Sequence, residues 1–341
     1  MDTKVRIPRL FVRVITLLVL IATLTGAGFA AAKGDKTGYE YYVVGNAGDV
    51  TTATTAGLLL MGGGPDVDEA FQWMSKKSGG GDFVVIRASG TDAYNPYIYA
   101  MGLVDSVETL IIKTRAAASD PFVVDKIRKA EALFIAGGDQ YDYVKYWKGT
   151  PVEDAIHSLV KRNVPIGGTS AGLAILGEFL FSAQNGTVYS DDALANPYNR
   201  RVTLDRDFLT LPNMGKVITD GHLDYRDRMG RLVTFLARIV QDGWSAEAKG
   251  IGIDVETAIA VENGTASLFG TGAAYFLRTP GMPEVCQDRT PLTFRNLSVQ
   301  RLSGSSGTFN VKNWSGNDTT NYTLSAEEGV LTSTQVGGGI Y

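Results

Sequence analysis

Cysteine and histidine are scarce in this chain, which has one cysteine, Cys286, and two histidines, His157 and His222. A single cysteine excludes an intramolecular disulfide framework and a zinc site built from cysteine ligands. With so few histidines as well, the sequence shows no metal-ligand cluster, and we expect no metal at the functional site. The chain also lacks a large excess of charge. Its net charge of -4 at pH 7 gives no reason to expect nucleic acid as a partner.

Residues 1–33 have the composition of a targeting segment. The basic residues are Lys4, Arg6, Arg9 and Arg13. They precede an apolar run at residues 14–24, and residues 29–32 provide small side chains for a signal peptidase. An uncleaved membrane anchor is the alternative, although the apolar run is short for a bilayer span. We therefore expect a secreted or periplasmic protein, or one that contacts a membrane only through this segment.

The pattern of residues 34–284 predicts one α/β domain. The hydrophobic content of 44% is ample for its core. Strands are expected at 55–61, 82–90, 109–112, 132–136 and 164–167, and helices at 67–77, 95–105, 121–129 and 151–162. This alternation favours a mostly parallel, doubly wound sheet with flanking helices, and it places ligands at the carboxyl ends of the strands.

The second half of the chain has a less regular pattern. We expect a helix at 171–181, a long loop at 182–213, a hairpin across Asn263 and Gly264, and a strand at 275–277. Long loops in compact domains are often lids, so the loop would close over the site. Residues 285–341 are rich in Ser, Gly, Thr and Asn, and they indicate a small β-rich appendage or tail.

Residues 164–172, Val-Pro-Ile-Gly-Gly-Thr-Ser-Ala-Gly, are a short apolar strand that enters a turn of small residues. Gly168, Ser170 and Gly172 have the Gly-x-Ser-x-Gly spacing of a nucleophile elbow, a tight turn that exposes the serine Oγ. Glycine suits these positions because a Cβ would collide with neighbouring backbone. A turn that only packs tightly is the alternative. The helical patterns before and after the strand favour the elbow.

A serine hydroxyl needs a base within hydrogen-bond reach, and histidine is the usual one. His157 lies off the apolar stripe of its expected helix, which indicates a surface residue. His222 follows a short apolar strand and precedes Arg226, Arg228 and Arg231 near the beginning of a helix. Cations oppose the helix dipole there, so we interpret the arginines as a cluster that binds a carboxylate or relays charge. A solvated charged turn and structural ion pairs are the alternatives.

Four motifs in a fixed order carry a resemblance to a known family. They are Gly-Gly-Asp-Gln (137–140), Gly-Thr-Ser-Ala-Gly (168–172), Asp-x-His-x-x-x-Arg-x-Arg-x-x-Arg-Leu (220–232) and Gly-Ile-Gly-Ile-Asp (250–254). Over roughly residues 55–278 the chain resembles cyanophycinase and its relative dipeptidase E. These serine peptidases are similar in fold to class I glutamine amidotransferases, with serine in place of cysteine.

The resemblance implies roles for the residues around the elbow. The N–H of Ala171, which follows the nucleophile, is expected to stabilise an oxyanion. By resemblance, the second oxyanion donor is Gly138. Gln140 matches a glutamine of the family's substrate pocket, and Asp220 and the three arginines match its other substrate-binding residues. Gly221 is a departure, because the family has a polar residue before the histidine.

The acid that would orient His222 is harder to assign. In the family a glutamate does this from a Gly-Ile-Asp-Glu stretch, but here Val255 occupies the aligned position. Carboxylates stand on both sides of it, and strand alternation would point Asp254 and Glu256 to the same face. We predict Glu256, with Asp254 as the alternate. A protein without an orienting acid is the remaining alternative.

These observations predict an exported serine peptidase with a triad of Ser170, His222 and Glu256 or Asp254. The expected partner is a small peptide or polypeptide cleaved next to an aspartyl residue, such as cyanophycin or an Asp-containing peptide. No cofactor is expected, and a homodimer is compatible with the sequence. A non-catalytic binding protein on the same scaffold is one alternative. An esterase is another, but the acid of an α/β-hydrolase precedes its histidine, and no histidine follows His222 here.

Overall fold

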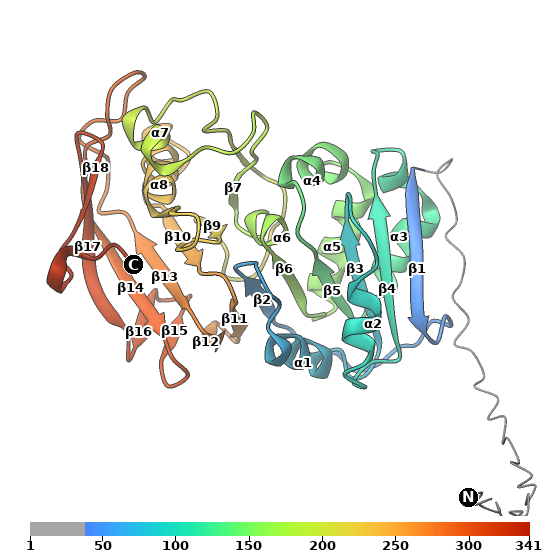
Figure 1. The fold of residues 1–341 in the computed structure, drawn as a ribbon. Helices are drawn as coiled ribbons and strands as arrows, with labels where there is room; N and C mark the ends of the chain where they lie inside the picture. The colour runs from blue at the N-terminus through green and yellow to red at the C-terminus, as the bar shows by residue number, and fades with distance from the viewer. Residues whose placement is uncertain (1–37) are drawn as a thin grey trace, which may run out of the picture.

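The computed structural model describes residues 38–341, so the targeting segment expected at residues 1–33 lies outside the described residues. Within the described chain, no helix combines the length and the hydrophobicity that a bilayer crossing requires. The chain forms two mixed sheets with helices packed against them (Figure 1).

The larger sheet contains the strands that follow the predicted strand–helix alternation. Its strands are β1 (Tyr39–Gly45), β2 (Leu58–Met61), β3 (Asp82–Arg87), β4 (Ser106–Ile112), β5 (Ala132–Ile135), β6 (Ile166–Thr169), β11 (Thr257–Glu262), β12 (Thr265–Gly270), β15 (Thr308–Asn310) and β16 (Ser315–Asn317). Their order is β1-β4-β3-β5-β6-β2-β11-β12-β15-β16. Strands β4, β3, β5, β6 and β2 are parallel, and the others add antiparallel strands at the two ends.

Helices cover both faces of the parallel strands because successive side chains of each strand point to opposite faces. The helices are α1 (Asp68–Lys77), α2 (Tyr94–Tyr99), α3 (Pro121–Lys129), α4 (Gln140–Trp147) and α5 (Pro151–Lys161). In β2, Leu59 and Met61 pack in the same core cluster as Phe71 of α1. Leu58 and Leu60 belong to the cluster that contains α3 and α5. The predicted α/β class with flanking helices is therefore confirmed.

The smaller sheet adjoins the larger one where β6 ends. Its strands are β7 (Phe179–Phe181), β8 (Leu204–Arg206), β9 (Val217–Gly221), β10 (Lys249–Ile253), β13 (Ala273–Arg278), β14 (Phe294–Ser303), β17 (Thr320–Glu327) and β18 (Val330–Ser333). Their order is β18-β17-β14-β13-β10-β9-β7-β8, with β7, β9 and β10 parallel. Helix α8 (Met229–Gln241) packs on this sheet, and α7 (Ser190–Ala195) packs on α8.

The segment after residue 284 is rich in strands, and these strands continue both sheets. β14, β17 and β18 extend the smaller sheet beyond β13, while β15 and β16 extend the larger sheet beyond β12. The hairpin β11–β12 turns at Asn263 and Gly264, both with positive φ, which confirms the expected turn.

The helix expected at 171–181 is wrong in its extent. α6 covers only Ala171–Ala174, and the chain then passes into β7. A Cβ on Gly177 would lie 2.5 Å from the Val217 carbonyl oxygen, so the chain passes β9 too closely for a continuing helix. The apolar residues of 179–181 are buried as a strand because Phe179 pairs with Ile218 of β9.

Three smaller expectations also need correction. The helix expected at 95–105 ends at Tyr99, shortly before Gly102, whose φ is +69°. Residues 182–213 are not all loop, since they contain α7 and β8. β1 has no counterpart among the expected strands, and it lies at the edge of the larger sheet beside β4.

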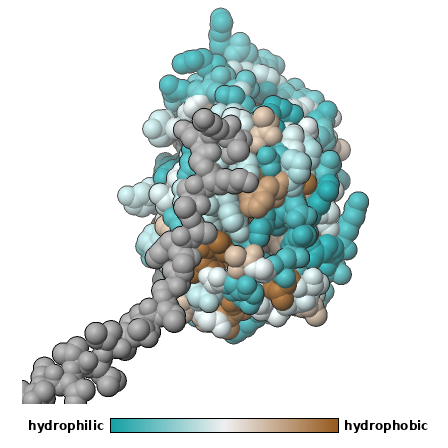
Figure 2. Space-filling model, turned by 90° about the vertical axis from the view of Figure 1, so that its right-hand side faces the viewer, coloured by the Kyte–Doolittle hydropathy of each residue, from teal (hydrophilic) through white to brown (hydrophobic). Residues whose placement is uncertain are grey.

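Figure 2 shows the molecule from the side on which β1 lies in Figure 1. Hydrophilic side chains cover most of this face, and the hydrophobic ones lie in separate areas among them. Scattered apolar side chains are usual on protein surfaces. The candidate site lies elsewhere, where β6 and β9 end.

Candidate active site

Ser170 lies between β6 and α6 with φ 53° and ψ -112°, a conformation that L-residues rarely adopt. The surrounding glycines make this turn possible. A Cβ on Gly172 would lie 2.0 Å from the Ile135 carbonyl oxygen, and one on Gly168 would lie 2.7 Å from the Gly172 carbonyl carbon. The backbone N–H of Ser170 donates to Met61 of β2 at 3.2 Å. The segment therefore has the strand-to-helix geometry expected of an elbow.

His222 follows β9 directly, and its Nε2 lies 2.9 Å from the Oγ of Ser170. The imidazole is held from two sides. The His222 backbone N–H donates to the Gly62 carbonyl at 2.8 Å, and a Cβ on Gly63 would lie 2.4 Å from Nε2. Only 7% of the His222 surface is exposed. The structure thus brings together the predicted nucleophile and base, although 51 residues separate them in the chain.

Among the described residues, neither predicted orienting acid makes a hydrogen bond to the imidazole. Asp254 accepts hydrogen bonds from the backbone N–H groups of Asp224 (3.2 Å) and Ala273 (2.9 Å), and from the Tyr275 hydroxyl at 3.4 Å. The Glu256 residue is exposed and has φ 52°. Across residues 38–341, no hydrogen bond joins either carboxylate to His222, and the assignment of the acid stays a prediction.

Contrary to the prediction from the sequence, Asp254 and Glu256 do not lie on one face of a strand. β10 ends at Ile253, so Asp254 and Glu256 lie in the turn beyond it. Burial, and then the neighbouring Asp224, raise the pKa of the Asp254 carboxyl to about 6. The Glu256 backbone N–H donates to Gly63 at 3.0 Å, so this turn contacts the glycine turn that packs on the imidazole.

Burial lowers the pKa of His222 from 6.5 to about 4, and the positive charges of Arg226 and Arg228 act in the same direction. The imidazole is therefore neutral, and able to accept a proton, at all pH values well above 4. We expect Ser170 to react with a fluorophosphonate at a rate that falls only as the pH drops through about 4.

The measurement is the second-order inactivation rate between pH 3 and 9, with circular dichroism as a check on folding. Arg226→Gln removes a positive charge beside the ring, so the acidic limb is expected to move to higher pH. If the wild-type inactivation rate instead fell near pH 6.5, the ordinary pKa of histidine, the lowered pKa of His222 would be contradicted.

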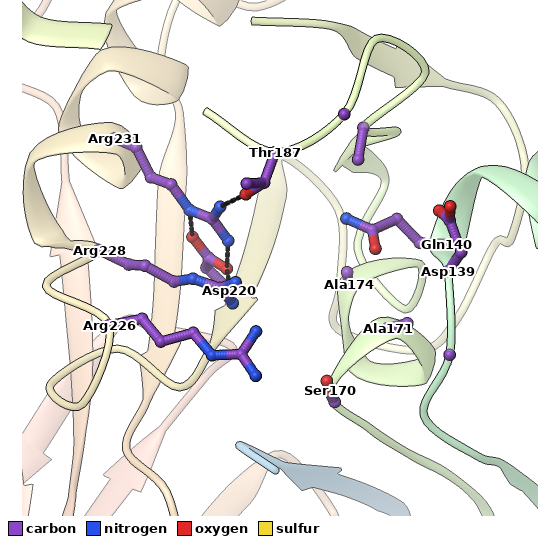
Figure 3. Close-up of a pocket in the computed structure, with 13 residues that line it drawn as sticks. Asp139, Gln140, Ser170, Ala171, Ala174, Thr187, Asp220, Arg226, Arg228 and Arg231 are labelled. Atoms are coloured by element: carbon purple, nitrogen blue, oxygen red, sulfur yellow. Dashed lines mark hydrogen bonds and ion pairs between the residues drawn. The ribbon is translucent and has the colours of Figure 1, made fainter. Parts of the chain in front are cut away.

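A pocket of about 250 Å³ opens beside Ser170 (Figure 3). Its lining contains all of the predicted substrate-binding and oxyanion residues. The lining residues are Gly138, Asp139, Gln140, Ser170, Ala171, Ala174, Ala183, Gly186, Thr187, Asp220, Arg226, Arg228 and Arg231. Ala171 begins α6, and the first N–H groups of a helix lack intrahelical acceptors. Gly138 and Ala171 thus lie at the same pocket as the nucleophile, and their roles as oxyanion donors stay predictions.

The three arginines have different surroundings. Arg231 is buried and makes two hydrogen bonds to Asp220, from Nε at 2.7 Å and from Nη2 at 2.6 Å. Arg228 donates to the Gly221 carbonyl at 2.8 Å and lies 3.6 Å from Asp220. The Arg226 side chain makes no hydrogen bond or ion pair with any other described residue, and its guanidinium extends toward Ser170 (Figure 3). Arg226 is therefore the guanidinium of the three that is available to a ligand.

Asp220 and Gln140 line the pocket, but both already have protein partners. The two carboxylate oxygens of Asp220 are occupied by Arg231, and the Gln140 side-chain amide donates to the Phe181 carbonyl at 3.2 Å. Asp139 lies beside Gln140 on the wall opposite the arginines (Figure 3). The pocket thus has a basic wall and a wall with one acidic side chain.

The segment expected to act as a lid forms a fixed wall of this pocket. Thr187 and Val188 accept hydrogen bonds from Arg231 at 3.0 and 3.3 Å. Ser190 accepts from the Arg231 backbone N–H at 3.1 Å and donates to the Asp227 carbonyl. The segment is therefore tied to the buried pair of Arg231 and Asp220.

The sequence motifs predict that the turns containing Asp139 and Gly63 lie at the site, but they predict no individual role for Thr187, Asp139 or Gly63. The Gly-Gly-Gly run at residues 62–64 is the one local signal that pointed to Gly63. His157 lies away from the pocket, where its Nε2 accepts from the Thr210 backbone N–H at 3.1 Å. Within residues 38–341, no group of three or more His, Cys, Asp or Glu side chains is arranged to hold a metal ion.

The chain is similar to several known proteins. The model of "Peptidase family S51" matches residues 58–269. A cyanophycinase from Geminocystis herdmanii is 27% identical over 217 residues, which cover 62% of this chain and 74% of the relative. A cyanophycinase from Nostoc sp. is 26% identical over 205 residues, which cover 58% of this chain and 63% of the relative. Among solved structures, a peptidase from an acI-B1 Actinobacterium has a TM-score of 0.49 at 15% identity, covering 74% of this chain and 98% of that chain.

Proposed function

Because the chain belongs to peptidase family S51, a family of serine-type peptidases, we propose that it is an exported enzyme that cleaves a peptide or isopeptide bond next to an acidic residue. The observation that carries this proposal is the 2.9 Å contact between Ser170 Oγ and His222 Nε2, at a pocket that contains an unpaired arginine. The basic segment and apolar run of residues 1–24 support export.

In the proposed reaction, Ser170 Oγ attacks the substrate carbonyl while His222 Nε2 takes its proton. The N–H groups of Ala171 and Gly138 donate to the oxyanion that develops. His222 then gives the proton to the leaving amine, and an acyl-enzyme remains. A water molecule, deprotonated by His222, hydrolyses the acyl-enzyme and restores the serine hydroxyl. Glu256 or Asp254 would orient the imidazole.

Arg226 indicates which class of substrate the pocket binds. A guanidinium with no partner in the described part of the chain is suited to a carboxylate, to which it can make two parallel hydrogen bonds. Asp139 on the opposite wall would favour a positive group elsewhere on the substrate. An aspartyl peptide fits this arrangement of charge, and so does cyanophycin, after which the related cyanophycinases are named. The substrate is thus a small peptide or polypeptide with an acidic side chain near the cleaved bond.

We expect Arg226→Gln to lower kcat/KM for an aspartyl dipeptide by about 10- to 100-fold, because a hydrogen bond to a charged group is lost. The matched asparaginyl dipeptide has no carboxylate, so its kcat/KM is expected to change less than about twofold if the effect is confined to that bond. The measurement is release of the leaving amine from both substrates.

Arg289→Gln is the control, since the Arg289 side chain is 89% exposed and lies outside the pocket. It is expected to leave both substrates unaffected. An equal loss on the aspartyl and asparaginyl substrates in Arg226→Gln would count against recognition of the acidic group.

A further inference from the structure

The last residues of the chain return to the segment that carries the arginines. We call residues 222–228, between β9 and α8, the arginine turn. The Tyr341 hydroxyl donates to Asp227 Oδ1 at 2.7 Å and accepts from the Met229 backbone N–H at 3.2 Å. The Tyr341 ring packs edge-on against Tyr275 of β13, with 6.1 Å between ring centroids. Figure 1 shows the C-terminal end of the chain on this side of the molecule.

The arginine turn is short and internally bonded, and its beginning is also held from outside. The Leu223 backbone N–H donates to the Ile253 carbonyl at 3.1 Å and the Asp224 backbone N–H to Asp254 Oδ1 at 3.2 Å, whereas residues 224–227 are exposed. Its backbone N–H groups at Arg226, Asp227 and Arg228 donate to carbonyls within the turn, at 3.1, 3.0 and 2.8 Å. Asp227 has φ 46°, which reverses the chain direction just after Arg226. The Asp227 residue connects the turn to two other segments. Its carbonyl accepts from Ser190, and its carboxylate accepts from Tyr341.

Tyr341 is itself fixed by the smaller sheet. The Tyr322 hydroxyl of β17 donates to the Ile340 carbonyl at 2.9 Å, and the Gln335 amide donates to the Gly339 carbonyl at 2.8 Å. Ile340 and Tyr341 also pack against the hydrophobic cluster that includes β13, β14 and β17. The phenol is therefore a fixed point that can hold the exposed part of the arginine turn.

The Arg226 side chain makes no hydrogen bond to any residue of 38–341, so its direction depends on the backbone from which it extends. We propose that Tyr341 is a positioning residue for substrate binding. Its hydroxyl holds Asp227, and through Asp227 it sets the course of the arginine turn, which aims Arg226 into the pocket beside Ser170. This inference rests on the proposed function, because it requires that Arg226 binds an acidic group of the substrate.

Tyr341→Phe tests the inference, since it removes the hydroxyl and keeps the ring. We expect KM for the aspartyl dipeptide to rise about three- to tenfold, the usual range for loss of one hydrogen bond, with kcat within about twofold. KM for the asparaginyl dipeptide is expected to stay unchanged. Asp227→Asn keeps an acceptor oxygen, so it should raise KM for the aspartyl dipeptide less than Asp227→Ala does.

The matched control is Tyr198→Phe. The Tyr198 hydroxyl donates to Asp242 at the same 2.7 Å, but Asp242 caps the far end of α8. This variant loses an equivalent tyrosine–aspartate hydrogen bond and is expected to keep KM for both substrates. Hydrogen–deuterium exchange gives a readout that needs no substrate. Amides of residues 223–228 should exchange faster in Tyr341→Phe and at the wild-type rate in Tyr198→Phe.

The outcomes separate this inference from the proposed function. If Arg226→Gln raises KM for the aspartyl dipeptide while Tyr341→Phe leaves both KM and exchange unchanged, the role of Tyr341 is overturned and the proposed function stands. If Arg226→Gln has no effect on KM, the proposed recognition of an acidic group fails, and the role of Tyr341 in substrate binding fails with it. In that case faster exchange in Tyr341→Phe would report only a structural contact.

Discussion

Replacement of Ser170 by alanine is expected to lower kcat by on the order of 10⁵-fold or more, because removal of a nucleophile abolishes the covalent route and leaves only binding and oxyanion stabilisation. The fold should not change, since alanine is smaller than serine and the Ser170 backbone conformation is enforced by its neighbours. The measurement is the turnover of an aspartyl dipeptide, together with covalent labelling by a fluorophosphonate probe. We expect complete loss of labelling.

The two histidines of the chain supply a matched pair of controls for this result. His222→Ala removes the base that lies 2.9 Å from Ser170 and should reduce labelling nearly as far. His157→Ala removes an imidazole that contacts Thr210 instead, and labelling should stay at the wild-type level. Labelling that persists in Ser170→Ala would show that another residue is the nucleophile.

Gly63→Ala is expected to lower kcat/KM by about 100-fold, the loss that a displacement of about 1 Å at a catalytic group can cause. The new Cβ would lie 2.4 Å from His222 Nε2, which is too close for a non-bonded carbon and nitrogen. The imidazole must therefore move, and with it the hydrogen bond to Ser170. The measurement is kcat/KM for the dipeptide, with the melting temperature recorded in parallel.

Gly64→Ala separates this effect from backbone strain. Gly63 and Gly64 both have positive φ, +100° and +86°, so alanine is strained at either position. A Cβ at Gly64 would instead meet Val255 at 3.1 Å, away from the imidazole. Both variants should lose similar stability, but only Gly63→Ala should lose most of its activity. Equal losses of activity would mean that the glycine turn acts through the backbone alone.

The sequence predicted the parts of this fold that local patterns determine. The elbow was visible because the spacing of Gly168, Ser170 and Gly172 falls between an apolar strand and a helical pattern. Its base was identifiable because the chain has only two histidines, and only His222 follows a strand. The alternating helices and strands before residue 170 followed from hydrophobic periodicity, which is a local property.

Contacts between distant segments explain what the sequence could not predict. An apolar run at 179–181 fits a helix or a strand equally well, and the neighbouring β9 decides in favour of β7. The different surroundings of Arg226, Arg228 and Arg231 depend on Asp220 and on the loop at Thr187. The orientation of Asp254 likewise depends on Ala273 and Tyr275, which follow it by about twenty residues in the chain.

Ser170, His222 and Glu256 lie in the turns that follow β6, β9 and β10, with φ values between 51° and 53°. Such conformations each cost on the order of 1 kcal/mol or more for residues other than glycine. In these turns, thermal stability and turnover are thus in competition. Directed evolution for thermal tolerance alone would favour substitutions that relieve these positive φ values. The selected variants would have higher melting temperatures and lower kcat.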